Sequence, residues 1–256
     1  MLENGHVALA VKESEQGATD LNGDGDVFDV VLFVHDLASG VTQNTRAAVT
    51  SASWHPSLAD DLYVCAISEA AQGGADLNRD GDTDDSVLHV FHRSTGVLSN
   101  IGLAVGRSAL DRSGNLLFFE VDENEQGGSD LDGDGDTSGH VLHVLDVTSG
   151  TWKNLATPGR VLSDGDRIVV SLGERGRDSN GDGDTLDIVW HLLGKNSRLV
   201  DLGLSGGTTE SDIMPPAFSS GLLPLRVSEA AEGDTDLDGD GNTSGVVLHV
   251  IDLDPD

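Results

Sequence analysis

Oxygen-bearing side chains recur at alternate positions in five short segments of this sequence. Every segment has the form Asp-x-[Asp/Asn]-x-Asp-Gly, and the five begin at Asp20, Asp76, Asp130, Asp178 and Asp236. Calcium is a hard cation that takes about six to eight oxygen ligands at roughly 2.3–2.6 Å. Carboxylates at positions 1, 3 and 5 converge when the chain curls around an ion, and a glycine at position 6 permits that sharp turn. The pattern therefore predicts calcium-binding loops.

The candidate ligands occupy positions 1, 3, 5 and 7 of every loop, and three loops add an aspartate at position 10. They are Asp20, Asn22, Asp24, Asp26 and Asp29; Asp76, Asn78, Asp80, Asp82 and Asp85; Asp130, Asp132, Asp134 and Asp136; Asp178, Asn180, Asp182, Asp184 and Asp187; and Asp236, Asp238, Asp240 and Asn242. Position 10 is Gly139 or Gly245 in the other two loops. We expect about five calcium ions per chain, one for each loop.

These loops resemble the first half of an EF-hand loop, and also the calcium loops of integrin-type propellers and thrombospondin repeats. The second half departs from the EF-hand pattern, because position 12 is a valine where that family has a bidentate glutamate. A carboxylate upstream is an alternative source for the missing ligand, and whether it binds calcium is left open here. The upstream candidates are Glu13, Glu69, Glu123, Glu174 and Glu229, seven residues before the loop except for Glu174, which is four before.

The negative charge of the chain is concentrated around these loops. Net charge is −31, and the stretches 13–29, 69–85, 122–139, 174–187 and 229–245 hold 30 of the 45 acidic residues but only three of the 14 basic ones. Asp, Asn and Gly favour solvated turns in any protein, but a turn does not require carboxylates at alternate positions. Such crowding opposes folding unless a cation neutralises it. The charge also argues against nucleic acid or an anionic membrane as a partner.

Magnesium and zinc fit these loops less well than calcium does. Magnesium tends to keep its waters, and zinc prefers Cys and His ligands. Four histidines do occupy one repeated place, where the first copy has Phe33: His89, His143, His191 and His249. They are either a ring of metal ligands or buried, hydrogen-bonded residues packed between repeats. We favour packing, because a phenylalanine fills the same place.

Short apolar runs flank every loop and predict the two strands of a hairpin. The runs before the loops are 7–11, 62–67, 116–121, 168–172 and 222–227, and those after are 30–34, 87–91, 141–145, 188–193 and 246–251. A more polar third strand is expected in each copy, as at 97–105, and a short fourth strand as at 107–110. The loops would then join the second and third strands of a four-stranded unit.

Four strands in a repeat of about 50 residues is the composition of a β-propeller blade. The strand order resembles that of WD-repeat and TolB-type propellers. We therefore expect an all-β domain spanning 1–256, with repeats near 1–48, 49–103, 104–157, 158–205 and 206–256. The first repeat is expected to lack its inner strand and the last its outer one. A fragment of a longer propeller, an imperfectly closed ring and a linear β-array all remain possible.

Function is less constrained than fold. Cys65 is the only cysteine, so no intramolecular disulfide can form, and no apolar stretch reaches membrane-spanning length. The sequence contains none of the common nucleophile, zinc-protease or phosphate-loop motifs. The start of the chain lacks the features of a signal peptide, although the natural start could lie upstream.

Two functions fit this sequence. The first is a calcium-stabilised extracellular, cell-surface or periplasmic module that binds an unknown protein or carbohydrate without catalysis. The second is an enzyme or ligand-binding propeller with its site in the central channel and calcium only as a structural element. Residues expected to line that channel are Ser51, Ser53, Trp54, Arg107, Asp111, Arg160 and Asp164. Its arginines would either hold an anionic ligand or pair with the neighbouring aspartates.

Overall fold

The computed structural model describes residues 2–3, 5–49, 58–59, 61–106, 111–156, 159–164, 167–174, 177–193, 199–207 and 222–252. The chain divides into two compact units, one formed by Met1–Leu110 and Leu117–Asn154 and the other by Asp111–Leu116 and Leu155–Asp256. We describe each unit by itself. No helix in the described part of the chain is long and apolar enough to span a membrane.

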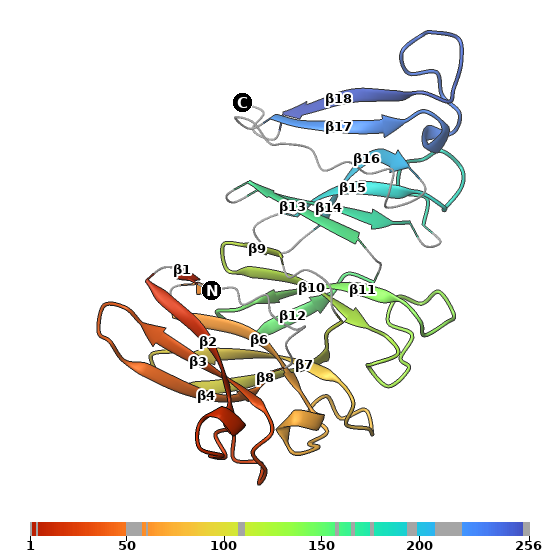
Figure 1. The fold of residues 1–256 in the computed structure, drawn as a ribbon. Helices are drawn as coiled ribbons and strands as arrows, with labels where there is room; N and C mark the ends of the chain where they lie inside the picture. The colour runs from red at the N-terminus through yellow and green to blue at the C-terminus, as the bar shows by residue number, and fades with distance from the viewer. Residues whose placement is uncertain are drawn as a thin grey trace. The chain divides into compact units, whose positions relative to one another are not determined.

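Successive antiparallel strands form one small sheet per repeat (Figure 1). The first sheet holds β1 (Leu2–Glu3), β2 (His6–Lys12), β3 (Val30–Asp36) and β4 (Thr42–Ala48); the second holds β5 (Leu58–Ala59), β6 (Leu62–Ser68), β7 (Ser86–His92) and β8 (Val97–Ala104); the third holds β9 (Asp111–Ser113), β10 (Leu116–Asp122), β11 (His140–Asp146) and β12 (Thr151–Asn154). The fourth holds β13 (Gly159–Asp164), β14 (Arg167–Gly173), β15 (Ile188–Leu193) and β16 (Leu199–Gly207), and the fifth holds β17 (Leu222–Ser228) and β18 (Val246–Asp252).

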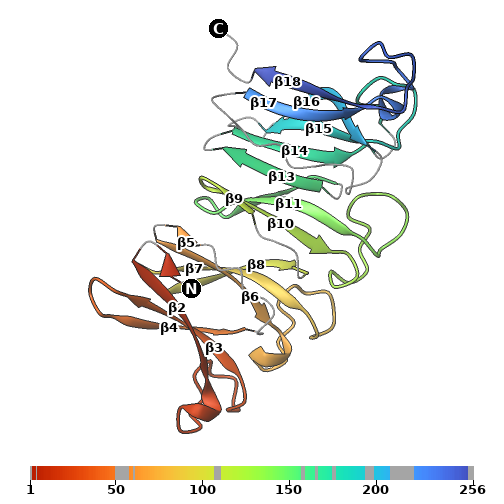
Figure 2. The ribbon, with the colours of Figure 1, turned by 45° about the horizontal axis from the view of Figure 1, so that its top comes forward.

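This arrangement confirms the predicted all-β architecture of propeller-type sheets. All ten apolar runs that flank the loops are strands, and they pair as predicted; β6 and β7, for example, pair in continuous register from Leu62 with His92 to Ser68 with Ser86. The acidic loops join the second and third strands of the first four sheets and connect β17 to β18 in the fifth (Figure 2).

The inner strands of the first and third sheets differ from those expected from the sequence. The first repeat was expected to lack its inner strand, and this was wrong, because β1 pairs with β2 through Leu2 and Glu3. Two residues are too few to show a periodic pattern, so the sequence carried no signal for this strand. The segment 107–110, expected as an inner strand, lies outside the described residues, and the inner strand of the third sheet is β9.

The hydrophobic core is distributed between neighbouring sheets. In the first unit, Leu32 and Val34 of β3 belong to the same buried cluster as Tyr63, Cys65 and Phe91 of the second sheet. A corresponding cluster joins the second sheet to the third, and another in the second unit joins the fourth sheet to the fifth. Each buried aliphatic side chain of this kind contributes about 1.5–3 kcal/mol. The hairpin of β6 and β7 is thus buried on both faces and is largely apolar, whereas the side chains of β18 alternate between exposed and half-buried.

The valines at position 12 of the loops belong to this core. Val31, Val87, Val141 and Val189 have no exposed surface, and they lie on the strands that follow their loops. A charged glutamate there would lose its hydration without a partner, at a cost of several kcal/mol. The departure from the EF-hand pattern therefore follows from the strand that begins where an EF-hand would continue into a helix.

Three of the repeated histidines bond to their own strands, and two of these three are buried. His89 and His143 are at most 4% exposed, and their Nδ1 atoms lie 2.9 Å from the carbonyl oxygens of Val87 and Val141. The ring of His143 lies 5.8 Å from that of Phe119 and 5.6 Å from that of Trp152, both in its own sheet. The interpretation as buried, hydrogen-bonded residues is confirmed for His89 and His143, whereas His191, which bonds to Val189 at 3.0 Å, and His249 are half-buried. The ring contacts of His143 lie within one repeat and not between two.

We predict that His143→Phe folds and lowers the free energy of unfolding at pH 7.5 by less than about 1.5 kcal/mol, since the side-chain volume is similar. Burial lowers the pKa of His143 in the folded protein, so the unfolded chain binds a proton more readily below about pH 6.5. The parent therefore loses stability as pH falls through that value. His143→Phe should lose less between pH 7.5 and 5.5, as measured by denaturant unfolding. Equal losses in both proteins would contradict this account.

Candidate metal centres

The first aspartate of each loop closes a tight turn by accepting backbone hydrogen bonds. Asp20 accepts from the N–H of Gly23 at 2.6 Å and from that of Gly25 at 3.1 Å. The other four loops repeat the first of these bonds at 2.6–2.7 Å. The glycine at position 6 has a φ of +102° at Gly25 and +110° at Gly81, a region that side chains with a Cβ rarely adopt. This confirms the turn predicted from the glycine.

The side chains at positions 3, 5 and 7 continue this ladder of hydrogen bonds. Each accepts from the N–H two residues further on: Asn22 at 3.3 Å, Asp24 at 3.0 Å and Asp26 at 2.9 Å in the first loop. The same three bonds occur in all the other loops, with lengths of 2.8–3.4 Å. The ladder curls the chain and brings the oxygen side chains together on the inside of the curve.

A buried glutamate holds both ends of every loop. Glu123 is 1% exposed; its Oε1 accepts from the N–H of Leu131 at 2.6 Å and its Oε2 from that of Gly139 at 2.8 Å. These donors are positions 2 and 10 of the loop, so one carboxylate spans the whole turn. The same two loop positions bond to Glu13, Glu69, Glu174 and Glu229. Backbone N–H donors stabilise a buried carboxylate in its charged form.

The structure thus gives these glutamates a role that the sequence did not reveal. The sequence leaves open whether they also bind calcium, and the geometry shows that they fix the loop backbone. A signal was present: the glutamate stands directly after the apolar run and seven residues before the loop in four copies. In the fourth copy, where the spacing is four, Glu174 still accepts from Ser179 at 2.5 Å and from Asp187 at 3.4 Å.

Carboxylate oxygens from each loop gather around its glutamate. In all five repeats, one oxygen from each member of a group lies within 4.8 Å of the others. The groups are Glu13, Asp26 and Asp29; Glu69, Asp82 and Asp85; Glu123, Asp130 and Asp132; Glu174, Asp182, Asp184 and Asp187; and Glu229, Asp236 and Asp238. The loop at 178–187, whose glutamate stands closest to it in the sequence, has the largest of these groups. The other predicted ligands lie on the same ladders but outside these groups: Asp20, Asn22, Asp24, Asp76, Asn78, Asp80, Asp134, Asp136, Asp178, Asn180, Asp240 and Asn242.

One buried oxygen lacks an interaction that a cation could supply. Asp24 Oδ2 is buried and, within the described part of the chain, has no hydrogen-bond donor. A buried charged oxygen without a donor is costly, because it has lost its hydration and gained nothing in return. A hard cation supplies that missing interaction, and the oxygen-only donor set matches the preference of calcium.

The aspartates at position 10 have raised pKa values. Burial, together with the nearby carboxylates of Asp24 and Asp26, raises the pKa of Asp29 to about 6. Burial is also the largest cause at Asp187, whose pKa rises to about 7, and at Asp85, where contact with Glu125 helps raise it to about 8. Crowded carboxylates hold protons because the charged forms repel one another. A divalent cation among them would reverse this effect.

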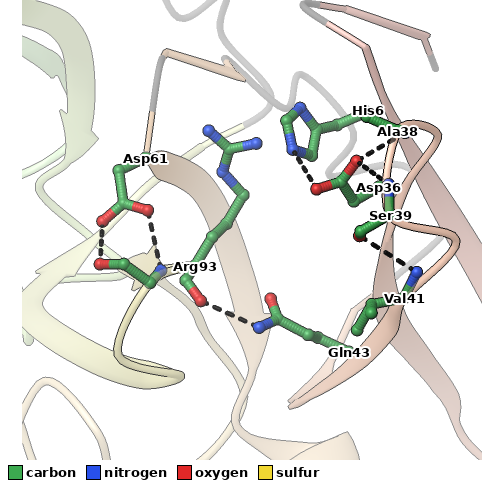
Figure 3. A network of polar contacts seen from close by, with 9 residues as sticks. His6, Asp36, Ala38, Ser39, Val41, Gln43, Asp61 and Arg93 are labelled. Carbon is green, nitrogen blue, oxygen red and sulfur yellow. Dashed lines mark hydrogen bonds and ion pairs between the residues drawn. The ribbon is translucent and has the colours of Figure 1, made fainter.

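A separate cavity of about 310 Å³ lies beside the first two sheets, at the ends of their strands that are opposite to the acidic loops (Figure 3). It is lined by His6, Val34, Asp36, Ser39, Val41, Gln43, Asp61, Arg93 and Ser94. Its carboxylates are already engaged, Asp36 by the N–H of Ala38 at 2.7 Å and Asp61 by the N–H of Ser94 at 2.8 Å. Arg93 Nε is buried and, among the described residues, has no hydrogen-bond partner. Among the described residues, this nitrogen therefore donates no hydrogen bond to the acids beside it.

The residues expected to line a central channel remain untested. Ser51, Ser53, Trp54 and Arg107 lie outside the described residues. Asp111 lies on β9, and Arg160 and Asp164 lie on β13, but the surroundings of their side chains lie outside the described part as well.

No family model and no curated protein matches this sequence. Several solved structures resemble the fold. The β-propeller domain of the Trilobed protease from Pyrococcus furiosus is 10% identical, with a TM-score of 0.44 over 98% of this chain and 66% of that one. An acylaminoacyl peptidase of Pyrococcus horikoshii is 12% identical, with a TM-score of 0.42 over 97% and 36%. TolB from Acinetobacter baumannii is 13% identical, with a TM-score of 0.35 over 97% and 50%. This chain thus spans about two thirds or less of their lengths.

We predict that calcium binding releases protons near neutral pH, mainly from Asp85. With a pKa of about 8, Asp85 is largely protonated at pH 7 without a cation, and an ion must displace that proton. Calcium affinity of this loop should therefore fall as pH drops from 8 to 6. Calorimetry at pH 7 in buffers of different ionisation enthalpy measures the release, and Asp85→Asn should reduce it. Equal proton release from parent and Asp85→Asn would contradict the prediction.

Proposed function

We propose that this chain is a calcium-binding, calcium-stabilised propeller-type module that acts outside the cell, at its surface or in the periplasm. Its role in this proposal is non-catalytic binding or adhesion to a protein or carbohydrate. The observation that carries the calcium proposal is the identity of five independent loops. Each has the same ladder of hydrogen bonds, the same glutamate at its base and a group of carboxylate oxygens within 4.8 Å.

The charge of the chain supports calcium as a folding ligand. Five divalent ions would change the net charge from −31 to about −21 and would do so where the acids are densest. A site filled at about 100 times its dissociation constant contributes about 2.7 kcal/mol of stability. Five such sites are comparable with the whole stability of an ordinary domain, about 5–15 kcal/mol. Extracellular calcium sites are often of modest affinity, which suits a compartment rich in calcium.

We predict that a chelator lowers the melting temperature by tens of degrees at low salt. Each kcal/mol shifts the melting temperature of a chain this size by about 2–4 °C, and repulsion among the acids adds to the loss. High salt should partly restore the melting temperature, since screening shortens the Debye length to about 3 Å at 1 M. Calorimetric melts with and without chelator test this directly. If the two curves coincide, calcium does not support the fold.

We predict that metal analysis finds about five calcium ions in the parent and about four in Asp80→Ala. Asp80 stands at position 5 of its loop, where its carboxylate accepts from the N–H of Asp82 at 3.1 Å. Asp84→Ala is the matched control, because it removes one charge from the same exposed loop at a position outside the predicted ligand set. The control should keep all the ions. A parent that binds at most one ion, or equal losses in both variants, would rule out this assignment.

A second candidate function, binding of a carboxylate-bearing ligand, rests on Arg93. The buried Nε without a partner and the cavity of about 310 Å³ beside it favour an oxyanion that a guanidinium can hold through two hydrogen bonds. The place of Arg93 is taken by Leu37 and Val147 in the first and third repeats, so the repeat itself does not require a cation here. In this account calcium would support the fold and the cavity would bind the ligand.

We predict that Arg93→Leu removes binding of small carboxylates while leaving calcium binding intact. Leucine is the residue of the first repeat at this place, and the change removes the one arginine among the described residues that line the cavity. Titration with acetate and succinate, followed by nuclear magnetic resonance of the cavity residues, measures this. Inorganic phosphate serves as the comparison anion. Absence of saturable shifts in the parent would exclude the candidate.

A further inference from the structure

Three of the loops bond to the repeat that follows them. The side-chain amide of Asn22 donates to the carbonyl of Ala71 at 2.9 Å, that of Asn78 to Glu125 at 3.0 Å and that of Asn180 to Ala231 at 2.7 Å. In every case the donor is position 3 of the loop and the acceptor lies two residues after the buried glutamate of the next repeat. The first two junctions lie within the first unit and the third within the second unit.

The same amide also bonds inside its own loop. Asn78 Nδ2 lies 2.8 Å from Asp85 Oδ2, and the corresponding distances in the other two loops are 3.3 Å. The amide nitrogen is thus committed to the position-10 carboxylate and to the next repeat. This orients the amide oxygen toward the inside of the loop, where it accepts from the N–H of Asp80 at 3.3 Å. Position 3 is therefore held in place from outside its own repeat.

The following repeat also makes contacts back to the preceding one. Gln72 accepts from the N–H of Ala48 at 3.0 Å, and Gln126 accepts from that of Ala104 at 2.8 Å. The N–H of Ser205 likewise bonds to Glu232. These side chains stand three residues after the buried glutamates, so one short segment both accepts from the loop and bonds the last strand of the preceding sheet.

A glycine in the segment after the buried glutamate lies close to the acidic loop of the preceding repeat. A Cβ added to Gly127 would lie 2.8 Å from the Cβ of Asp80, and one added to Gly73 would lie 3.0 Å from that of Asp24. Both glycines have positive φ. Gly233 is in the same position relative to Asp182, at 3.2 Å. Thus the position-5 aspartate, a candidate ligand, is in van der Waals contact with the next repeat.

The residue at position 3 divides the five loops into two kinds. Loops with asparagine at position 3 have aspartate at position 10, whereas the loops at 130–139 and 236–245 have aspartate at position 3 and glycine at position 10. The repeat that follows the 130–139 loop is also the one whose segment between glutamate and loop is three residues shorter. Asparagine therefore occurs where a full-length segment follows to accept its amide.

We propose that the loops at 20–29, 76–85 and 178–187 couple calcium binding to docking of the next repeat. The inference rests on the proposed calcium function. Asparagine 3 and aspartate 5 contact both the site of the ion and the neighbouring repeat. Docking of the next repeat orders these two side chains and so lowers the entropic cost of binding the ion. Binding of the ion lowers the cost of docking in the same way, because such coupling is reciprocal.

The test uses a pair of glycines with matched backbone strain. Gly127→Ala introduces a Cβ against Asp80 of the preceding repeat, whereas Gly17→Ala introduces one at the same repeat position, with a φ of +71° against +68°, where nothing lies within 4 Å. Gly127→Ala should lower the calcium affinity of the 76–85 loop about tenfold, a common size for such coupling. Gly17→Ala should leave the affinity of that loop unchanged. Calorimetry of the full chain, with Asp80→Ala identifying the heat of this loop, supplies the measurement.

A second readout is hydrogen exchange at the amide of Ala104, which bonds across the junction to Gln126. Calcium should slow this exchange in the parent and slow it less in Asn78→Asp, which keeps the oxygen at position 3 but loses the donor. Asp238→Asn, the reverse change in a loop of the other kind, should leave the exchange of Ala104 as in the parent. If the parent binds calcium while the two glycine variants have equal affinity and Asn78→Asp exchanges like the parent, the coupling is absent. A parent that binds no calcium refutes the proposed function itself.

Discussion

The hydrogen bonds between a buried glutamate and both ends of its loop are the interaction on which the rest of each repeat depends. They connect the end of an apolar strand to the acidic turn, so the packing of the sheet positions the turn. In the third repeat, Glu123 bonds to Leu131 and Gly139, and the strand β11 begins immediately afterwards at His140. The charge of the glutamate is stabilised by N–H groups that would otherwise remain unsatisfied in the turn. Core packing and loop shape are therefore one cooperative unit.

This arrangement fixes the shape of the loops but leaves their crowded negative charges without a compensating positive charge. The ladder and the glutamate hold the acidic side chains close together, and they are not free to move apart. The raised pKa of Asp85, about 8, and the buried oxygen of Asp24 without a donor are two consequences of the same confinement. Preorganised ligands cost little to order when an ion binds, so this confinement of the acids favours the cation sites proposed here.

Much of this could be read from the sequence because the signals were local. Apolar runs predict strands, and glycine at position 6 predicts a turn of positive φ, without knowledge of any distant contact. The sequence did not distinguish a Glu69 that accepts hydrogen bonds from the loop backbone from a Glu69 that binds metal, since a carboxylate suits both roles. The contact of Asn78 with Glu125 depends on how two repeats pack, which no local pattern encodes. Even so, the pairing of asparagine at position 3 with aspartate at position 10 was a readable sign of two loop classes.

The weak interior of these sheets explains why polar junctions matter so much. Only 4% of the residues are aromatic, so neighbouring sheets pack mainly through Val, Leu and Ala, which bury less area than rings. In a repeat protein, stability is approximately the sum of repeat and nearest-neighbour terms. In the proposed function, an ion held beside a junction would add to both terms at once, because the loop belongs to one repeat and touches the next. Removing one ligand should therefore be felt in two repeats, and its effect should fade beyond them.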